Sequence, residues 1–184
     1  MSAATIVRVT LTTAAALAGP KRQTPGHRRP PIVIKGCRDA ILSVRAATKR
    51  VLIVDDQPIV VGVLRAFFAQ FQHGHTYELT TASSANDAFI LLLQEQFDLI
   101  LLDIVLPMID YWHVQQAAGL DLLKRVRDLG VTAPVLMMTG GDGGTPREVE
   151  ALIEGAFGYL HKPFVWSELD HLVTLALSPR AASG

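Results

Sequence analysis

The chain has 184 residues, of which 49% are hydrophobic, and its formal net charge is zero. This length suits one ordinary domain with an extension, and the apolar stretches fall short of the ~20 residues of a membrane-spanning helix. The single cysteine, Cys37, excludes an internal disulfide and a cysteine-based metal cluster, and it favours a cytoplasmic setting.

Charge divides the chain near residue 50. Residues 1–50 contain ten Lys and Arg and one acidic residue, Asp39, whereas residues 51–184 contain seven Lys and Arg and sixteen Asp and Glu. Gly and Pro interrupt residues 1–48 repeatedly, so we expect a basic, disordered N-terminal extension there. The extension is interpreted either as a solvated tail or as a contact for an anionic partner such as nucleic acid.

Residues 9–18 form a mostly apolar stretch after Arg8 and resemble a secretory signal peptide. Three threonines within the stretch make the match poor. We therefore expect the chain not to be secreted.

Five short runs predict strands of one parallel sheet. They cover residues 51–54, 78–81, 99–102, 135–138 and 159–161. The most apolar of these runs show little alternation, which is typical of strands buried on both faces.

Helical patterns alternate with these strands. Pro58 fits the first turn of one helix, Ser84 with Asp87 resembles a capping box, and Ser167 is a candidate N-cap. The expected helices cover residues 58–71, 119–129, 146–156 and 168–177, and a further helix after Ser84 has apolar residues on one face from 85 to 92. This order predicts an α/β fold with a five-stranded parallel sheet, doubly wound and flavodoxin-like, in a domain of residues 49–178 followed by a short tail, 179–184.

Polar side chains follow four of the predicted strands. Asp55 and Asp56 end the first strand, Asp103 the third, Thr139 the fourth and Lys162 the fifth. Because the carboxyl ends of parallel strands meet at one edge of a sheet, we expect these side chains to share a small volume.

Three carboxylates in such a volume predict a cation. Two unit charges about 4 Å apart repel by roughly 4 kcal/mol at an effective dielectric constant near ~20. Oxygen ligands without Cys or His favour Mg²⁺, so we expect Mg²⁺ on Asp55, Asp56 and Asp103 with the backbone carbonyl of Val105.

The same edge has the groups that phosphoryl transfer needs. Asp103 is a candidate nucleophile that would form an aspartyl phosphate. Lys162 would neutralise the oxygens of the incoming phosphoryl group, and the Thr139 hydroxyl would donate a hydrogen bond to one of them.

Residues 51–56, 98–107, 138–140 and 162–164 resemble the receiver domain of two-component response regulators. The resemblance covers about residues 49–178. It implies a signalling domain rather than an enzyme, phosphorylated by a phosphohistidine on a sensor histidine kinase or a histidine phosphotransfer protein. On this resemblance Asp103 is the phosphoacceptor, and Asp55 and Asp56 are the acidic metal pair. Thr139 is the switch hydroxyl and Tyr159 the switch aromatic. Lys162 contacts the phosphate, and Pro163 follows a cis peptide bond.

The resemblance also predicts the output. Only seven residues follow Leu177, so we expect a stand-alone receiver with no DNA-binding domain after it. Such a domain would dock an unknown downstream protein on the face formed by residues 146–156, 159–161 and the last helix. A dimer is also compatible with the sequence.

One segment departs from the family pattern. The family usually has a glycine directly after the position of Asp110, whereas here residues 111–118 intervene before Gly119. The segment is interpreted as a longer start of the next helix, or as an insertion that shields the site or reshapes the partner surface.

The polar residues at the strand ends have three other interpretations. Helix capping explains one carboxylate but not three together with Thr139 and Lys162. An aspartyl-phosphate phosphatase would have its two acids separated by one residue after the first strand, whereas Asp55 and Asp56 are adjacent. A receiver-like interaction module that works without phosphorylation is the main alternative.

Overall fold

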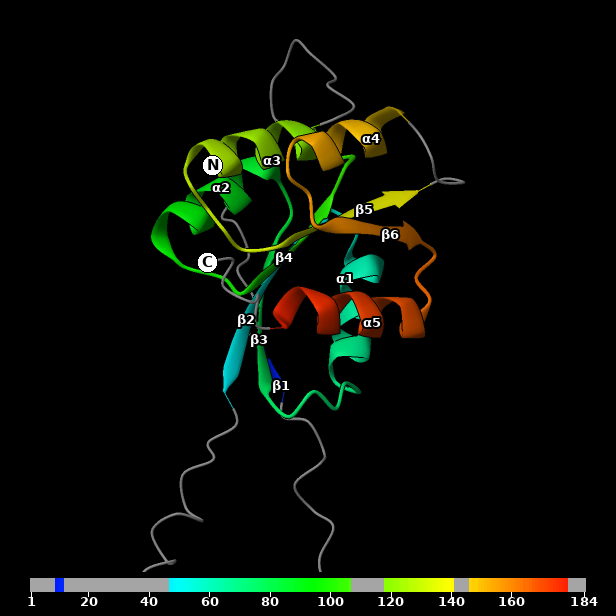
Figure 1. Ribbon diagram of the computed structural model, residues 1–184. Coiled ribbons are helices and arrows are strands. Elements are labelled where there is room, and N and C mark those ends of the chain that lie inside the picture. The colour runs from blue at the N-terminus through cyan, green and yellow to red at the C-terminus, as the bar shows by residue number, and fades with distance from the viewer. Residues whose placement is uncertain (1–8, 12–46, 107–117, 141–145, 179–184) are drawn as a thin grey trace, which may run out of the picture.

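The computed structural model describes residues 9–11, 47–106, 118–140 and 146–178, and it has one sheet with the strand order β1-β3-β2-β4-β5-β6 (Figure 1). β2 to β6 are parallel, which confirms the predicted five-stranded parallel sheet. The elements are β1 (Val9–Leu11), β2 (Thr48–Val54), α1 (Pro58–Phe68), β3 (Thr76–Ala82), α2 (Ala85–Gln94), β4 (Leu99–Asp103), α3 (Ala118–Asp128), β5 (Val135–Gly140), α4 (Pro146–Ile153), β6 (Gly158–Lys162) and α5 (Trp166–Leu177).

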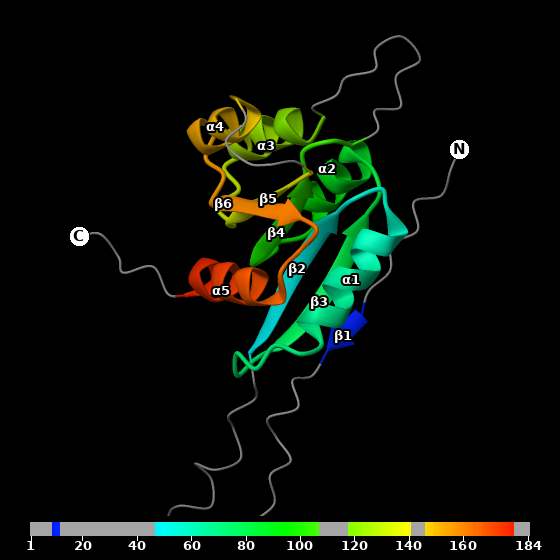
Figure 2. The same cartoon turned by 90° about the vertical axis from the view of Figure 1, so that its right-hand side faces the viewer.

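Helices cover both faces of the sheet, as expected for a doubly wound fold. Val51 and Ile53 of β2 pack with residues of α1 and α5, whereas Leu52 and Val54 pack with residues of α2, α3 and α4. Figures 1 and 2 show α1 and α5 on one side and the other three helices on the opposite side. Because successive side chains of a strand point to opposite faces, both sets of residues are buried, which explains the nearly continuous apolar runs in the sequence.

β1 is a strand that could not be predicted from the sequence. It pairs antiparallel with the outer edge of β3, and Thr10 lies opposite Glu78. Val and Thr favour extended backbone, but three residues are too few for a recognisable pattern. Residues 9–11 therefore belong to the sheet rather than to a disordered extension. Thr48, which was also predicted to belong to the extension, is the first residue of β2. Residues 1–8 and 12–46 lie outside the described ranges.

The structure confirms one of the two predicted N-caps and contradicts the other. The N-cap at Ser84 is confirmed, since its side chain accepts a hydrogen bond from the Asp87 N–H at 3.1 Å. α5 instead begins at Trp166, ahead of Ser167, with Val165 at the cap position and no capping side chain. Its start is set by the burial of its apolar face rather than by a cap.

The predicted ends of two helices are three residues too late. α1 ends at Phe68. Phe71 continues the apolar spacing and is fully buried, but it lies in the connection that follows the helix. α4 ends at Ile153, and Gly155 with a φ of 88° directs the chain away from it. No helix in the described ranges has the length and apolar character that crossing a membrane requires.

A hydrogen-bond chain joins α5 to β3 at the amino-terminal edge of the sheet. His73 Nε2 lies 2.9 Å from Asp170 Oδ1, and His73 Nδ1 contacts the hydroxyl of Tyr77. His75 Nε2 lies 3.0 Å from the same hydroxyl. Tyr77 is fully buried, so these two imidazoles satisfy a hydroxyl that water does not reach.

This arrangement predicts a loss of stability in acid. Burial lowers the pKa of His75, and the nearby His73 and Lys49 act in the same direction. The unfolded chain then binds the His75 proton more readily than the native chain does, so stability falls as the pH drops below about 6.5 and levels off below the folded-state pKa. Unfolding temperatures measured across this range should fall for the wild type, and should fall less for His75→Gln. An equal fall in both proteins would assign the acid sensitivity to other groups.

Candidate functional site

Three carboxylates gather at the carboxyl edge of the sheet. β2 leads directly into Asp55 and Asp56, and β4 ends at Asp103. Because β2 and β4 pair in parallel with Val54 opposite Leu102, these ends lie side by side. One carboxylate oxygen from each residue lies within 4.8 Å of the others. The predicted acidic cluster is therefore present in the fold.

Lys162 Nζ bridges the two buried carboxylates. It donates to Asp55 Oδ2 at 2.7 Å and to Asp103 Oδ2 at 2.6 Å. The other oxygens accept backbone hydrogen bonds, Asp55 Oδ1 from the Gln57 N–H at 2.9 Å and Asp103 Oδ1 from the Val105 N–H at 3.1 Å. Asp55 and Asp103 are 2% and 3% exposed, whereas Asp56 is exposed. The bridge explains how two carboxylates remain together in the interior.

Burial and charge act in opposite directions on this group of residues. Burial raises the pKa of Asp55, and its hydrogen bonds to Lys162 and to the Gln57 backbone only partly offset this. For Lys162, burial favours the neutral amine, but the hydrogen bonds to Asp103 and Asp55 outweigh it and raise the pKa. The site therefore has an excess of buried negative charge that a further cation would relieve.

The donor set fits Mg²⁺. The three clustered side chains offer only carboxylate oxygens, which are hard ligands, and exposed Asp56 gives a hydrated ion access. Val105 follows Asp103 by two residues, and its N–H donates a hydrogen bond to that carboxylate. Its carbonyl oxygen has no described contact, so its role as a ligand stays a prediction.

Thr139 and Tyr159 lie on the next two strands of the sheet, β5 and β6. Thr139 is one residue beyond Met138, the β5 partner of Asp103, and is 8% exposed. Tyr159 lies deeper on β6, opposite Met137, and packs against the core on the α2–α4 side of the sheet. The fold thus places Thr139 at the carboxyl edge of the sheet, one residue beyond the level of Asp103, and Tyr159 deeper along β6. The Lys162–Pro163 peptide bond is cis.

Gly119 is a site residue whose importance the sequence alone does not reveal. An added Cβ on Gly119 would lie 1.9 Å from the backbone oxygen of Asp103 and 2.9 Å from Ile104 Cα. Its N–H also donates to the Ile104 carbonyl at 3.2 Å. Only glycine permits this approach, so α3 supports the backbone that presents Asp103.

The run of residues before Gly119 is only partly described. Ala118, predicted to belong to the intervening segment, is the first residue of α3 and is buried, as is Leu106 on the other side of the gap. Residues 107–117 lie outside the described ranges. The two predicted roles of this segment stay open.

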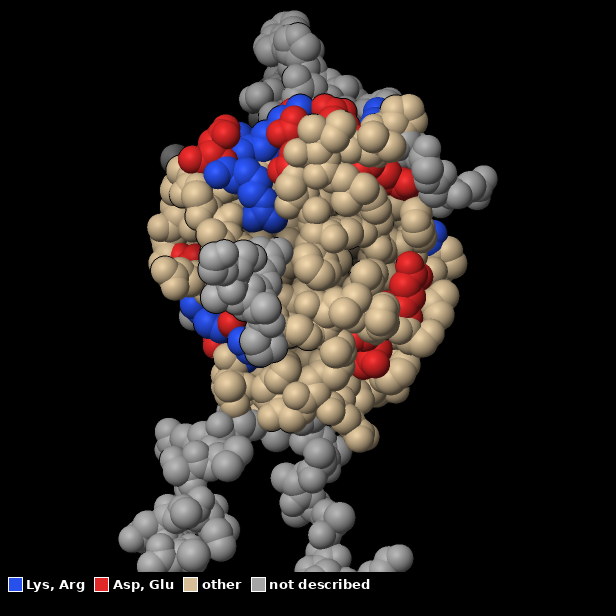
Figure 3. Space-filling view, in the orientation of Figure 1, with Lys and Arg blue, Asp and Glu red and all other residues tan. Residues whose placement is uncertain are grey.

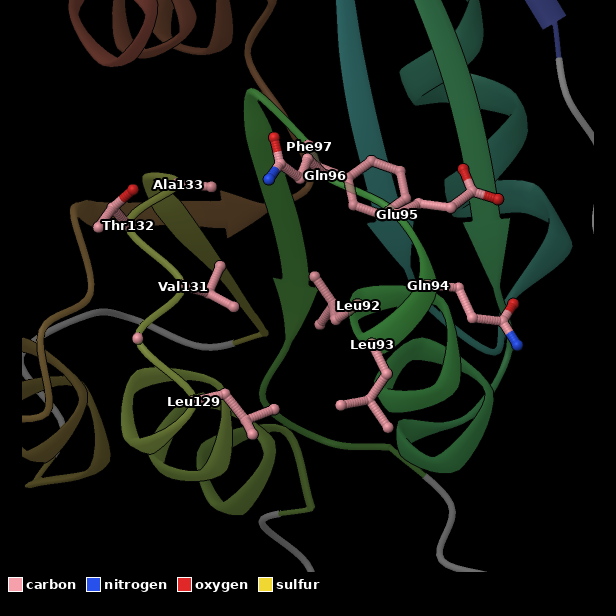
Figure 4. A pocket seen from close by; sticks show the side chains of 11 residues that line it. Leu92, Leu93, Gln94, Glu95, Gln96, Phe97, Leu129, Val131, Thr132 and Ala133 are labelled. Carbon is pink, nitrogen blue, oxygen red and sulfur yellow. The ribbon is translucent and has the colours of Figure 1, made fainter.

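A separate hollow of about 470 Å³ lies at the opposite edge of the sheet (Figure 4). It lies between the connections that enter β4 and β5, with Leu92, Phe97, Leu129 and Val131 among its lining residues. None of the clustered carboxylates borders it. The candidate site is therefore the carboxylate cluster and not this hollow.

Removal of the Lys162 ammonium is expected to destabilise the protein. Lys162→Met should lower the free energy of unfolding by about 2 kcal/mol at neutral pH, because two buried carboxylates would face each other without a cation. This is below the usual cost of breaking a buried pair, since the Lys162 side chain is 17% exposed. Urea unfolding without divalent cations measures it. Lys124→Met is the control, since the Lys124–Glu150 pair lies on the surface and should change little. Equal effects in both variants would contradict a special role for the bridge.

Comparisons with known proteins identify the family of this chain. Residues 51–174 match the family described as the response regulator receiver domain. The chain is 32% identical over 134 residues to the transcriptional regulatory protein DltR of Streptococcus agalactiae, covering 73% of this chain and 53% of that protein. It is 36% identical over 122 residues to the response regulator protein PmrA of Pseudomonas aeruginosa, covering 66% and 49%. The chain thus spans about half the length of these curated relatives.

Solved structures show the same fold. A putative response regulator from Chloroflexus aurantiacus is 32% identical with a TM-score of 0.59, and the match covers 71% of this chain and 98% of that chain. A CheY-like receiver domain protein from Methanospirillum hungatei is 27% identical with a TM-score of 0.59, covering 71% and 94%. Together with the acidic cluster at the sheet edge, these matches show that the chain belongs to the response regulator receiver domain family of two-component signalling.

Proposed function

We propose that this receiver accepts a phosphoryl group on Asp103 in a Mg²⁺-dependent reaction. The observation that supports this most strongly is the Lys162 bridge, which joins Asp103 to Asp55 at the carboxyl edge of the sheet. The receiver is proposed to occupy residues 49–178 together with β1 and with Thr48, the first residue of β2. The other residues of 1–48 would form an extension and residues 179–184 a tail.

In the proposed reaction the donor is a phosphohistidine on a sensor histidine kinase or a histidine phosphotransfer protein. A carboxylate oxygen of Asp103 forms a bond to phosphorus while the phosphorus–nitrogen bond of the donor breaks and the imidazole leaves. Lys162 shifts its hydrogen bond from the carboxylate to a phosphoryl oxygen, and its ammonium balances part of the added charge. In this step the domain accepts a phosphoryl group that another protein supplies.

The residues that would hold Mg²⁺ are Asp55, Asp56 and Asp103, with the backbone carbonyl of Val105. The ion, when bound, supplies positive charge for the phosphoryl oxygens. Asp55 has a raised pKa because it is buried, so a cation beside it would keep its carboxylate ionised.

We further propose that Thr139 and Tyr159 form the switch. The Thr139 hydroxyl would move to donate a hydrogen bond to the phosphoryl group, and Tyr159 would adjust into the space that Thr139 leaves. Burial raises the pKa of Tyr159, and the charge of Glu148 adds to the increase, so the phenol stays protonated. The pair would thus form a two-state element that phosphorylation biases.

The proposed output is docking of a downstream protein on α4, β6 and α5. Apolar side chains of α4 are exposed there, with Val149 at 54%, Leu152 at 51% and Ile153 at 78%. This face is mostly uncharged in Figure 3. An exposed apolar surface of this kind favours contact with a protein.

The test is the intact mass of the protein after incubation with acetyl phosphate. We expect one labile phosphoryl adduct in the presence of Mg²⁺ and none after chelation of divalent cations. Peptide mapping should assign the adduct to Asp103. If the folded protein acquires no adduct from acetyl phosphate or from candidate kinases, the alternative function, a receiver-like interaction module that needs no phosphorylation, would replace the proposal.

A further inference from the structure

The first turn of α4 places a buried carboxylate against β6. Glu148 is 5% exposed, and its Oε1 lies 3.9 Å from His161 Nδ1. Acidic side chains are seldom this buried unless a partner group stabilises the charge. Glu148 also takes part in other interactions, so the contact with His161 is one of several that involve it.

His161 presents an unsatisfied nitrogen to Glu148. Its Nδ1 is buried and has no hydrogen-bond partner among the described residues, although the side chain as a whole is 39% exposed. The 3.9 Å separation is about 1 Å longer than an N–H···O hydrogen bond. Buried polar atoms without partners are rare in folded proteins, so this gap calls for an explanation.

The gap lies directly beside the proposed switch. His161 is opposite Thr139 in the pairing of β5 with β6, and the next residue, Lys162, holds Asp103. Tyr159 is two residues earlier and therefore points to the same face of β6 as His161. Glu148 acts on Tyr159 as well, since its charge contributes to the raised pKa of the phenol.

We propose that Glu148 and His161 are positioning residues that couple phosphorylation of Asp103 to the position of α4. When Thr139 moves towards the phosphoryl group, the first turn of α4 moves towards β6 by about 1 Å. Glu148 Oε1 then accepts a hydrogen bond from the N–H at His161 Nδ1. A shift of this size is typical of helix movements in switching proteins, and it changes the presentation of the exposed apolar residues of α4. This inference rests on the proposed function.

The test is a titration with beryllofluoride, which mimics a phosphoryl group on a carboxylate, at saturating Mg²⁺. The amide resonances of Thr139 and Gly140 report binding. Glu148→Met and His161→Leu should each weaken the apparent affinity about tenfold, the effect of one hydrogen bond to a charged group. The double variant should be no weaker than either single variant, because both changes remove the same contact.

Matched variants separate this coupling from a general effect. His161→Gln should recover most of the affinity, since its side-chain amide can donate to Glu148. Glu150→Met on α4, which removes only a surface pair with Lys124, and His171→Leu on α5 should behave as the wild type, because both residues are exposed. In the wild type, a protected His161 ring N–H resonance should appear at saturation.

Two results would contradict the inference in different ways. A normal wild-type response with unchanged affinity in both single variants, or with additive losses in the double variant, would overturn the coupling alone. The absence of any wild-type response to beryllofluoride would overturn the proposed function and, with it, this coupling.

Discussion

Asp103→Asn is expected to acquire no phosphoryl adduct under conditions in which the wild type acquires one. The substitution keeps the shape of the side chain, and the asparagine oxygen can still accept the Val105 N–H that Asp103 Oδ1 accepts at 3.1 Å. It removes the negative charge and the nucleophilic oxygen, which the reaction cannot replace with an amide. The loss should therefore be complete while the protein remains folded, and intact mass with circular dichroism measures both.

Asp128→Asn is the matched control for this substitution. Asp128 is exposed at the end of α3 and takes no part in the carboxylate cluster. The control should acquire the adduct as the wild type does. An adduct that persists in Asp103→Asn would move the phosphoacceptor to another residue, and Asp55 and Asp56 would be the first to examine.

Gly119→Ala is expected to cause the largest loss of stability among glycine-to-alanine substitutions in the described parts of the chain. The new Cβ would lie 1.9 Å from the Asp103 backbone oxygen, a distance at which the backbone itself must move. We expect the free energy of unfolding to fall by about 3 kcal/mol, at the upper end of the range for overpacking. Phosphoryl uptake should fall as well, since the displaced backbone presents the nucleophile. Urea unfolding and adduct formation measure the two effects.

Gly62→Ala provides the comparison. Gly62 is exposed within α1, and a Cβ there would meet no atom within 4 Å. Alanine favours helix over glycine by roughly 0.5–1 kcal/mol, so this variant should be slightly more stable than the wild type. If both substitutions had the same small effect, the close approach of α3 to Asp103 would not be required.

The strands and the ends of the strands could be predicted from the sequence. The apolar runs before Asp55, Asp103 and Thr139 have little alternation, because helices cover both faces of the sheet. A parallel sheet then brings the residues after these runs to one edge whatever the details of the helices. For this reason the sequence is sufficient to predict that Asp55 and Asp103 lie close together.

The limits of helices were less predictable. Phe71 continues the apolar spacing of α1 yet lies beyond its end, and Ser167 has the chemistry of a cap yet lies inside α5. In both cases burial against the rest of the core decided the backbone, and local propensity was the weaker influence. β1 could not be predicted because its position depends on the open edge of β3, which exists only after the sheet has formed.

By itself, the sequence determined the α/β class, the alternation of five parallel strands with helices along the chain, and the residues at the carboxyl edge of the sheet. These features follow from hydrophobic periodicity and local spacing. Only the tertiary structure decided that Lys162 bridges Asp55 and Asp103, that Gly119 must be glycine, and that Glu148 faces His161. Each of these contacts joins residues distant along the chain at a separation set by packing. Local sequence patterns carry no information on such distances, since these are fixed only when the helices and strands are packed together.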